Sequence, residues 1–383
     1  MSDKIILKGI TWGHSRGITP LLAFSQRYNE LHKNVEIQWH KRSLQEFADF
    51  PIEKLTETYD LLIVDHPWVG CAAATKCVLP LEQYLSKEYL QNQEENSVGY
   101  SHLSYNYEGS QWALAIDAAT PVASYRKDLF EQNKRTLPQT WEDVVALAAE
   151  GKVAVPAIPI DLLMNFYTFC VANGNAPFAG KDEVVDKETG LKALESMKAL
   201  WSKIPKWMFE YNPIAVAELL STSDEFWYCP LAYGYSNYSR IGYAKHLLSY
   251  TNVVSLNGSP LKTTLGGTGI SVSAGSSYKK EAVAFAEAVV SENVQTYFYT
   301  DNGGQPGHRK AWTNEHANAI TGNFFQNTLL TLDNAYIRPR YNGYLHFQDH
   351  AGDPIRQYLR DGSNPEEVLT AINTIYKDSF KHP

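Results

Sequence analysis

The stretch "YDLLIVDHPWVG", Tyr59 to Gly70, contains a short apolar run followed directly by polar and aromatic side chains. The run, Leu61 to Val64, is too short for a helix and is typical of a strand in the interior of a sheet. Asp65, His66 and Trp68 follow it almost at once. A buried strand that ends on an acid, an imidazole and a large aromatic ring predicts one wall of a ligand site.

The segments around this strand alternate between strand and helix patterns. Residues 4–12 and 35–40 are predicted as strands, with a helix between them from about Pro20 and a further helix over residues 44–55. This order is typical of a doubly wound α/β domain with a mostly parallel sheet. Ligands of such sheets bind beyond the carboxyl ends of the strands. The loop "TWGHSRG", residues 11–17, is therefore expected at the same edge as Asp65.

Length and composition narrow the class of protein. A chain of 383 residues is too long for one ordinary core, so two domains are expected. The net charge is -8 and the 34 Lys and Arg are scattered, which argues against nucleic acid as a partner. The four cysteines lack the spacing of a zinc site, and we predict no metal site and no cofactor.

The first residues of the sequence bear on the cellular location of the protein. It passes from a polar start straight into a predicted strand, without the basic and apolar regions of a signal peptide. We expect a periplasmic or extracellular location if a signal peptide was removed, and a cytoplasmic one if the chain is complete as written.

Four segments, taken in order and spacing, resemble the extracellular solute-binding proteins of sugar ABC transporters, the maltose-binding-protein-like group. They are residues 20–39, 59–70, 116–148 and 266–312, and they include "YRKDLF" and "GGQPGH". The resemblance implies an α/β, periplasmic-binding-protein-like (type II) fold, with two doubly wound α/β lobes, a hinge and a central ligand cleft. Lobe one would be residues 1–117 plus 262–307, and lobe two 118–261 plus 308–383. The hinge would lie near residues 118, 262 and 307.

Candidate ligand-binding residues lie after predicted strands or in aromatic, glycine-containing loops. Those near the first strands and at the first crossing are Trp12, His14, Arg16, Asp65, His66, Trp68 and Asp117. Those from the loop "YGYSNYSR" and from later loops are Tyr233, Tyr235, Asn237, Tyr238, Arg240, Gln305, His308, Arg340 and Tyr341. Their rings suit stacking on a sugar, and core packing is the open alternative. For Asp65, the open alternatives are a helix cap or a surface charge.

The predicted function is a monomeric solute-binding protein that closes two lobes around a small polar ligand and delivers it to an ABC transporter permease. The ligand would be a carbohydrate or a sugar-derived acid. The alternative is a cytoplasmic enzyme on the same scaffold, with His14, Asp65 and His66, together with Asp117, as acid–base groups. A sensor or regulatory protein that uses the same closure is a third reading.

Overall fold

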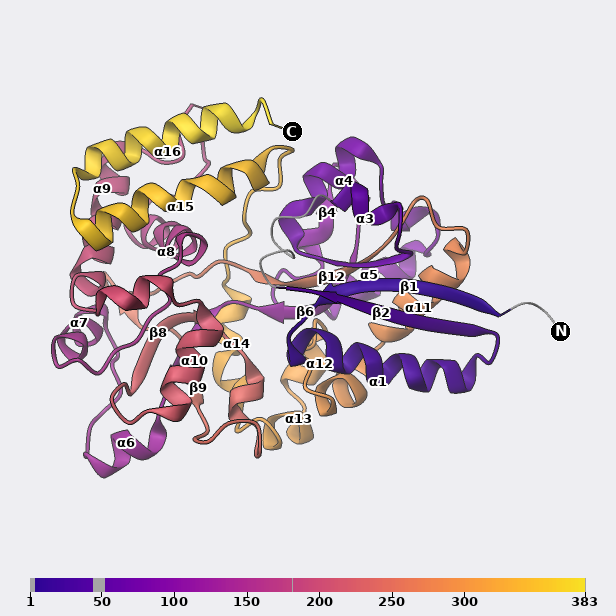
Figure 1. Cartoon of the computed structure of the whole chain (residues 1–383), viewed down its shortest axis with the longest axis horizontal. Coiled ribbons are helices and arrows are strands. Elements are labelled where there is room, and N and C mark those ends of the chain that lie inside the picture. The colour runs from indigo at the N-terminus through magenta and orange to yellow at the C-terminus, as the bar shows by residue number, and fades with distance from the viewer. Residues whose placement is uncertain (1–3, 44–51, 181, 383) are drawn as a thin grey trace. The chain divides into compact units, whose positions relative to one another are not determined.

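The computed structural model describes residues 4–43, 52–180 and 182–382, and the chain forms two compact units (Figure 1). Unit 1 takes in Met1–Ala119, Gly266–Ile320 and Arg340–Asn342. Unit 2 takes in Thr120–Leu265, Thr321–Pro339 and Gly343–Pro383.

The division differs from the predicted lobes after residue 307. Residues 308–320 and Arg340–Asn342 belong to unit 1, although they were assigned to lobe two. The reason is local pairing, because His308 forms a β-bridge with Ser97 and the backbone N–H of Arg309 donates to the carbonyl of Asn96 at 2.7 Å. The other two crossings fall at Ala119/Thr120 and Leu265/Gly266.

Unit 1 is built on a five-stranded sheet in the order β2-β1-β3-β12-β6. Its strands are β1 (Ile5–Trp12), β2 (Val35–Arg42), β3 (Leu61–Val64), β6 (Leu114–Ala119) and β12 (Gly266–Val272). β1 runs parallel to β2 and β3, and β12 runs antiparallel to both β3 and β6. β3 is buried along its whole length, as its apolar sequence predicts. The carboxyl ends of β1, β3 and β6 therefore share one edge.

Helices and short elements surround this sheet. They are α1 (Ser15–Leu31), α3 (Ile52–Thr56), η1 (His66–Trp68), α4 (Val69–Thr75), η2 (Leu81–Gln83), α5 (Lys87–Glu95), η3 (Leu103–Tyr105), β4 (Asn106–Tyr107), β5 (Ser110–Gln111), α11 (Lys279–Val289), η6 (Val294–Tyr299), α12 (Arg309–Trp312) and α13 (Glu315–Ala319). Phe24 of α1 packs against Phe285 and Phe298, with ring centroids 5.7 and 5.9 Å apart. This aromatic contact joins α1 to α11 and η6.

One predicted helix begins earlier in the structure than expected, and a second lies mostly outside the described residues. α1 begins at Ser15 rather than near Pro20, because His14 caps it and Pro20 is accommodated inside the helix at the loss of one backbone hydrogen bond. The helix predicted over residues 44–55 lies mostly outside the described residues, and its described part belongs to α3.

Unit 2 has a three-stranded antiparallel sheet in the order β8-β7-β9. Its strands and small hairpin are β7 (Pro121–Tyr125), β8 (Tyr228–Tyr233), β9 (Ser249–Thr251), β10 (Ser255–Leu256) and β11 (Ser259–Pro260). Its helices are α6 (Lys127–Gln132), α7 (Trp141–Ala149), α8 (Pro159–Ala172), α9 (Lys187–Trp201), η4 (Lys206–Glu210), α10 (Pro213–Thr222), η5 (Ser236–Ser239), α14 (Phe324–Asp333), α15 (Tyr344–Asp361) and α16 (Pro365–Ser379).

The core of unit 2 lies around α8, ten of whose residues are buried. Trp141 of α7 packs edge-on against Phe169 of α8, with ring centroids 4.7 Å apart. The capping box of α7 is present as its sequence predicts, with Thr140 and Asp143 bonding to each other's backbone N–H. α15 packs on α8 and α16, and Figure 1 shows α15 and α16 side by side.

Candidate functional site

Three parallel strands of unit 1 end at one edge of its sheet. Trp12 is the last residue of β1, and Val64 is the last residue of the neighbouring strand β3. Adjacent residues of β12 pair with Val64 on one side and with Asp117 of β6 on the other. Trp12, Asp65 and Asp117 therefore lie along the edge at which α/β sheets bind their ligands.

Arg16 and Asp117 form a buried ion pair at this edge. The Nε of Arg16 donates to Oδ2 of Asp117 at 2.9 Å, and Nη2 donates to Oδ1 at 2.5 Å. Their side chains are only 4% and 2% exposed. Burial raises the pKa of Asp117, and the charge of Arg16 opposes that shift. In this bidentate ion pair the two opposite charges neutralise each other within unit 1.

His14 caps α1 and stacks on Trp12. Its Nδ1 accepts a hydrogen bond from the backbone N–H of Arg16 at 3.0 Å. The rings of His14 and Trp12 are nearly parallel, with centroids 5.5 Å apart. Burial, and then the charge of Arg16, lower the pKa of His14 to about 4. His14 is therefore neutral at pH 7 and works as a hydrogen-bond acceptor.

Asp65 caps the short 3-10 helix η1 that follows β3. Its Oδ1 accepts a hydrogen bond from the backbone N–H of His66 at 2.8 Å. His66 is fully buried, and its ring meets Tyr105 edge-on with centroids 6.4 Å apart. Trp68 is buried as well. Of these predicted site residues only Asp65, whose side chain is 25% exposed, reaches solvent.

Arg340 holds a loop of unit 1 together through backbone carbonyl groups. Its Nη1 donates to the carbonyl oxygens of Leu103, Ser104 and Asn106 at 3.0, 3.2 and 2.7 Å. These contacts give Nη1 of Arg340 a structural role, and contact of its side chain with a ligand stays a prediction. Tyr341 follows it and is half-buried.

Gly70 of α4 allows the segment of Arg340 to pack closely. A Cβ placed on Gly70 would lie 1.9 Å from the carbonyl oxygen of Arg340, a backbone atom that cannot turn aside. We expect Gly70→Ala to lower the free energy of unfolding by about 1–3 kcal/mol, despite the better helix propensity of alanine. Chemical denaturation would measure this loss. Gly180→Ala, where an added Cβ meets nothing within 4 Å, is the matched control. Equal stability of the two variants would contradict the close approach.

Gln305 and His308 also make contacts inside unit 1. The Nε2 of Gln305 donates to the carbonyl of Ala118 at 2.8 Å, next to the crossing into unit 2. His308 caps α12 by accepting from the backbone N–H of Lys310 at 3.2 Å. His308 also lines, with His102, a cavity of about 10 Å³, which is room for about one water molecule. Contact of the Gln305 and His308 side chains with a ligand stays a prediction.

In unit 2 the predicted residues lie at the end of β8 and in η5. The hydroxyl of Tyr233 lies 3.0 Å from Oγ1 of Thr264. Gly234 lets this turn pack closely, because an added Cβ would lie 2.9 Å from both Phe324 and Val122. Tyr233 is half-buried.

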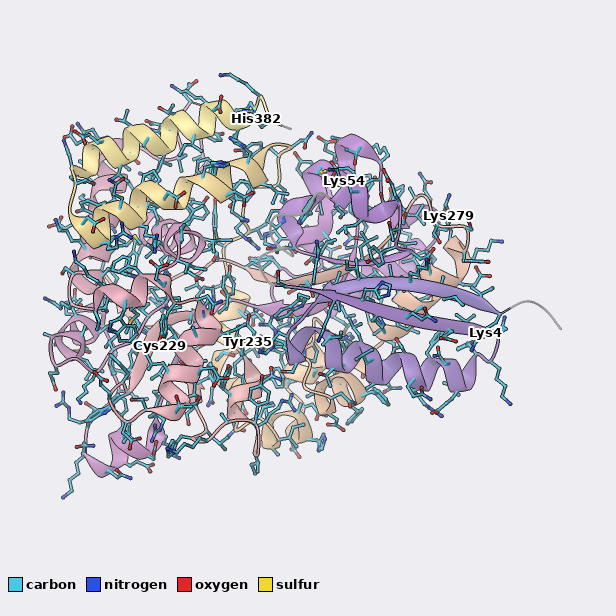
Figure 2. All side chains as sticks on the ribbon, in the orientation of Figure 1. Lys4, Lys54, Cys229, Tyr235, Lys279 and His382 are labelled. Carbon is cyan, nitrogen blue, oxygen red and sulfur yellow. The ribbon has the colours of Figure 1, made fainter. Side chains whose placement is uncertain are left out.

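The rest of the tyrosine-rich stretch is mostly internal. Tyr235, labelled in Figure 2, is 6% exposed, and its carbonyl accepts from the hydroxyl of Tyr250 at 3.1 Å. Tyr238 is fully buried and donates to Oε1 of Glu218 at 2.8 Å. Asn237 is buried too, and Arg240 is half-buried. The predicted site residues that remain partly exposed in the two units are His14, Asp65, Tyr233, Arg240, Arg340 and Tyr341.

Asp161 and Asn165 of α8 are polar residues that the sequence analysis missed. They are 7% and 2% exposed, and Oδ2 of Asp161 and Oδ1 of Asn165 have no hydrogen-bond partner among the described residues. Burial raises the pKa of Asp161 to about 8. Buried polar atoms without partners are unusual and mark candidate ligand contacts. The signal in the sequence was an Asp and an Asn one turn apart in the otherwise apolar "PIDLLMNFYTF".

Solved structures share this fold over nearly the whole chain. Maltose-bound MalE3 of T. maritima is 18% identical, with a TM-score of 0.85 over 97% of this chain and 99% of that one. A solute-binding protein of Agrobacterium radiobacter K84 in complex with ribitol is 19% identical, with a TM-score of 0.83 over 98% and 99%. One of Agrobacterium vitis S4 with bound D-mannitol is 13% identical, with a TM-score of 0.79 over 98% of each chain. No curated protein matches the chain by sequence.

The fold therefore defines a periplasmic-binding-protein-like α/β protein, which confirms the predicted fold class. The chain belongs to the bacterial extracellular solute-binding proteins, whose family model matches residues 23–318. This confirms the family that the sequence resembles. Among the described residues, no helix combines the length and the apolar character needed to cross a membrane.

Proposed function

We propose that this protein is the solute-binding component of an ABC transporter and that its ligand is a neutral sugar or polyol. Membership in the extracellular solute-binding family supports the first part. The second part draws support from the ligands of the structural neighbours, which are maltose, ribitol and D-mannitol in those proteins. The family also favours a location outside the cytoplasm.

The observation that carries the choice of a neutral ligand is the balance of charge at the sheet edge of unit 1. Both Nε and Nη2 of Arg16 donate to the carboxylate of Asp117, so this ion pair carries no net charge. His14 is neutral because burial lowers its pKa. An anionic ligand would need an uncompensated cation at this edge. A polyhydroxy compound needs hydrogen-bonding groups, and His14 and Asp65 are the partly exposed polar candidates at this edge.

The same contacts argue against acid–base chemistry by the predicted enzyme residues. His14 and Asp65 cap helices, His66 is fully buried, and the carboxylate of Asp117 is bonded to Arg16. A general acid or base must reach the proton that it transfers. Because these four side chains are capping, buried or ion-paired, the contacts favour binding over acid–base catalysis.

We further propose that both units contribute to binding and that the ligand shifts the population toward a closed form. Asp65 in unit 1, whose side chain is 25% exposed, and the half-buried Tyr233 in unit 2 are the candidates. The hinge would be formed where the chain passes between the units, near Ala119/Thr120 and Leu265/Gly266.

A panel of ligands tests the proposal. Maltose, ribitol, mannitol and the corresponding sugar acids would be titrated into refolded, ligand-free protein and followed by calorimetry and thermal unfolding. We expect a neutral sugar or polyol to bind and, at about 100 times its Kd, to add about 2.7 kcal/mol to the stability. Asp65→Asn and Tyr233→Phe should each weaken binding about tenfold or more. The exposed pair Lys192–Glu188 supplies the control Glu188→Gln, which should bind normally.

Three outcomes would contradict parts of this proposal. Binding of sugar acids in preference to neutral sugars would overturn the argument from charge balance. Chemical conversion of the bound compound would favour the enzyme alternative. Loss of binding in Asp65→Asn together with full binding in Tyr233→Phe would remove the evidence that unit 2 contributes through this residue.

A further inference from the structure

The last two helices bring a group of histidines to one place on unit 2. His346 and His350 lie one turn apart in the first half of α15. Asp378 lies in the last turn of α16, and His382, labelled in Figure 2, follows that helix. α15 and α16 pack together and are joined by a link of only three residues, so the start of one lies at the end of the other (Figure 1).

Gly343 sets how closely the two helix ends approach. Its φ is +106°, and a Cβ placed on it would lie 2.3 Å from the carbonyl oxygen of Ser379. Any other residue would push the end of α16 away. The backbone therefore places the side chains of His346 and Asp378 side by side.

The distances within this group suit a metal ion. Oδ2 of Asp378 lies 3.3 Å from Nε2 of His382 and 3.7 Å from Nε2 of His346. One ligand atom from each of the three residues lies within 4.8 Å of the other two. Zinc binds such nitrogen and oxygen atoms at about 2.0–2.2 Å, which puts neighbouring ligand atoms in a tetrahedral site about 3.3–3.6 Å apart. Small side-chain rotations would bring all three to that spacing.

Contacts with neighbouring side chains orient Asp378 and the histidines so that their possible metal-binding atoms lie on one side. Nζ of Lys381 lies 3.1 Å from Oδ1 of Asp378, so the other oxygen, Oδ2, faces the imidazoles. The ring of His346 stacks on that of His382 at 4.2 Å and lies 4.4 Å from that of His350. Nδ1 of His350 lies 2.8 Å from the carbonyl of His346, which fixes the orientation of its ring.

We propose that His346, Asp378 and His382 form a binding site for a divalent transition-metal ion of the zinc class. Two imidazole nitrogens beside one carboxylate oxygen form a ligand set that zinc accepts, whereas magnesium and calcium favour sites made of oxygen ligands alone. Three protein ligands leave one coordination position for water, so the site would be exchangeable. The ion would join the start of α15 to the residues after α16. No metal site was predicted for this chain, although its sequence contains the spacing His346-x-x-x-His350.

The test uses the full chain without a histidine tag, stripped of metal by a chelator. Titration with Zn²⁺ by calorimetry should show binding of one ion per chain, and Zn²⁺ should raise the Tm. His382→Ala, which lies on the surface beyond the last helix, should weaken binding about tenfold or more, and so should Asp378→Asn. Lys381→Gln should tighten Zn²⁺ binding, because it removes the ammonium group that competes with the metal ion for the carboxylate of Asp378.

A matched control is the surface pair of His316 and Asp301, whose Nε2 and Oδ1 lie 2.7 Å apart. This pair also joins an imidazole to a carboxylate, and both side chains are about half exposed. His316→Ala should leave Zn²⁺ binding unchanged. The proposal would be overturned if Zn²⁺ failed to bind at millimolar concentration, if His382→Ala bound it as tightly as the unaltered chain, or if Ca²⁺ bound equally well.

Discussion

Replacement of Arg16 by alanine is expected to lower the free energy of unfolding by about 3–5 kcal/mol, because it leaves the carboxylate of Asp117 buried without its cation. Asp117 is 2% exposed, and two hydrogen bonds from the guanidinium satisfy its oxygens. Arg16 also lies over the ring of Trp12, at 5.7 Å from its centroid. Chemical denaturation of the ligand-free protein would measure the loss.

A double replacement separates the ion pair from simple packing. Arg16→Met combined with Asp117→Leu removes both charges and keeps a similar volume, so it should cost clearly less than Arg16→Ala alone. Arg16→Lys keeps the charge but loses the bidentate geometry. The stability of this variant should therefore lie between those of the unaltered chain and of Arg16→Ala. A loss below about 1 kcal/mol in Arg16→Ala would show that the pair is not the main tie between α1 and β6.

The second large effect is expected at Asp161 and depends on pH. Burial raises the pKa of this carboxyl from 3.8 to about 8 in the folded protein. The folded chain therefore holds a proton that the unfolded chain releases, and stability falls as pH rises from about 4 to 8. Through this group, a rise in pH from 5 to 8 should lower the free energy of unfolding by about 3–4 kcal/mol.

Asp161→Asn tests this cost directly, because the amide is similar in shape and does not ionise. Relative to the unaltered chain, the variant should gain stability as pH rises from 5 to 8, and denaturation at several pH values would follow the difference. Asp353→Asn, at an exposed position of α15, is the matched surface control. A difference that stays constant with pH would mean that Asp161 titrates alike in the folded and unfolded chains.

Much of the fold could be predicted from local pattern. The run Leu61 to Val64 is a fully buried strand, and Thr140 with Asp143 forms the capping box of α7. Pro121 marks the point at which β7 begins after β6 has ended. These features depend on residues close together in sequence, whose periodicity and hydrogen-bonding chemistry can be read directly. The start of α1 was placed too late because Pro20 suggested a first turn, although a proline is tolerated inside this helix.

The candidate site was predicted less completely, because residue types do not reveal partners. Arg16 was predicted as a ligand-binding candidate, and its partner in the structure is Asp117, 101 residues away. Arg340 was read as a ligand group of lobe two, and it binds carbonyls in unit 1. Asp161 was overlooked because its burial comes from the packing of α8, which composition does not show.

The sequence by itself determined the α/β class, the family and the strand ends at which polar side chains gather, because alternation of apolar and polar residues and the order of segments are local properties. Only the tertiary structure decided which of those side chains bind one another. It paired Arg16 with Asp117, and it brought Asp378 and His382 beside His346 by folding α16 back along α15. Charge balance and metal-ligand spacing depend on distances between residues far apart in the chain, and the packing of the core sets those distances.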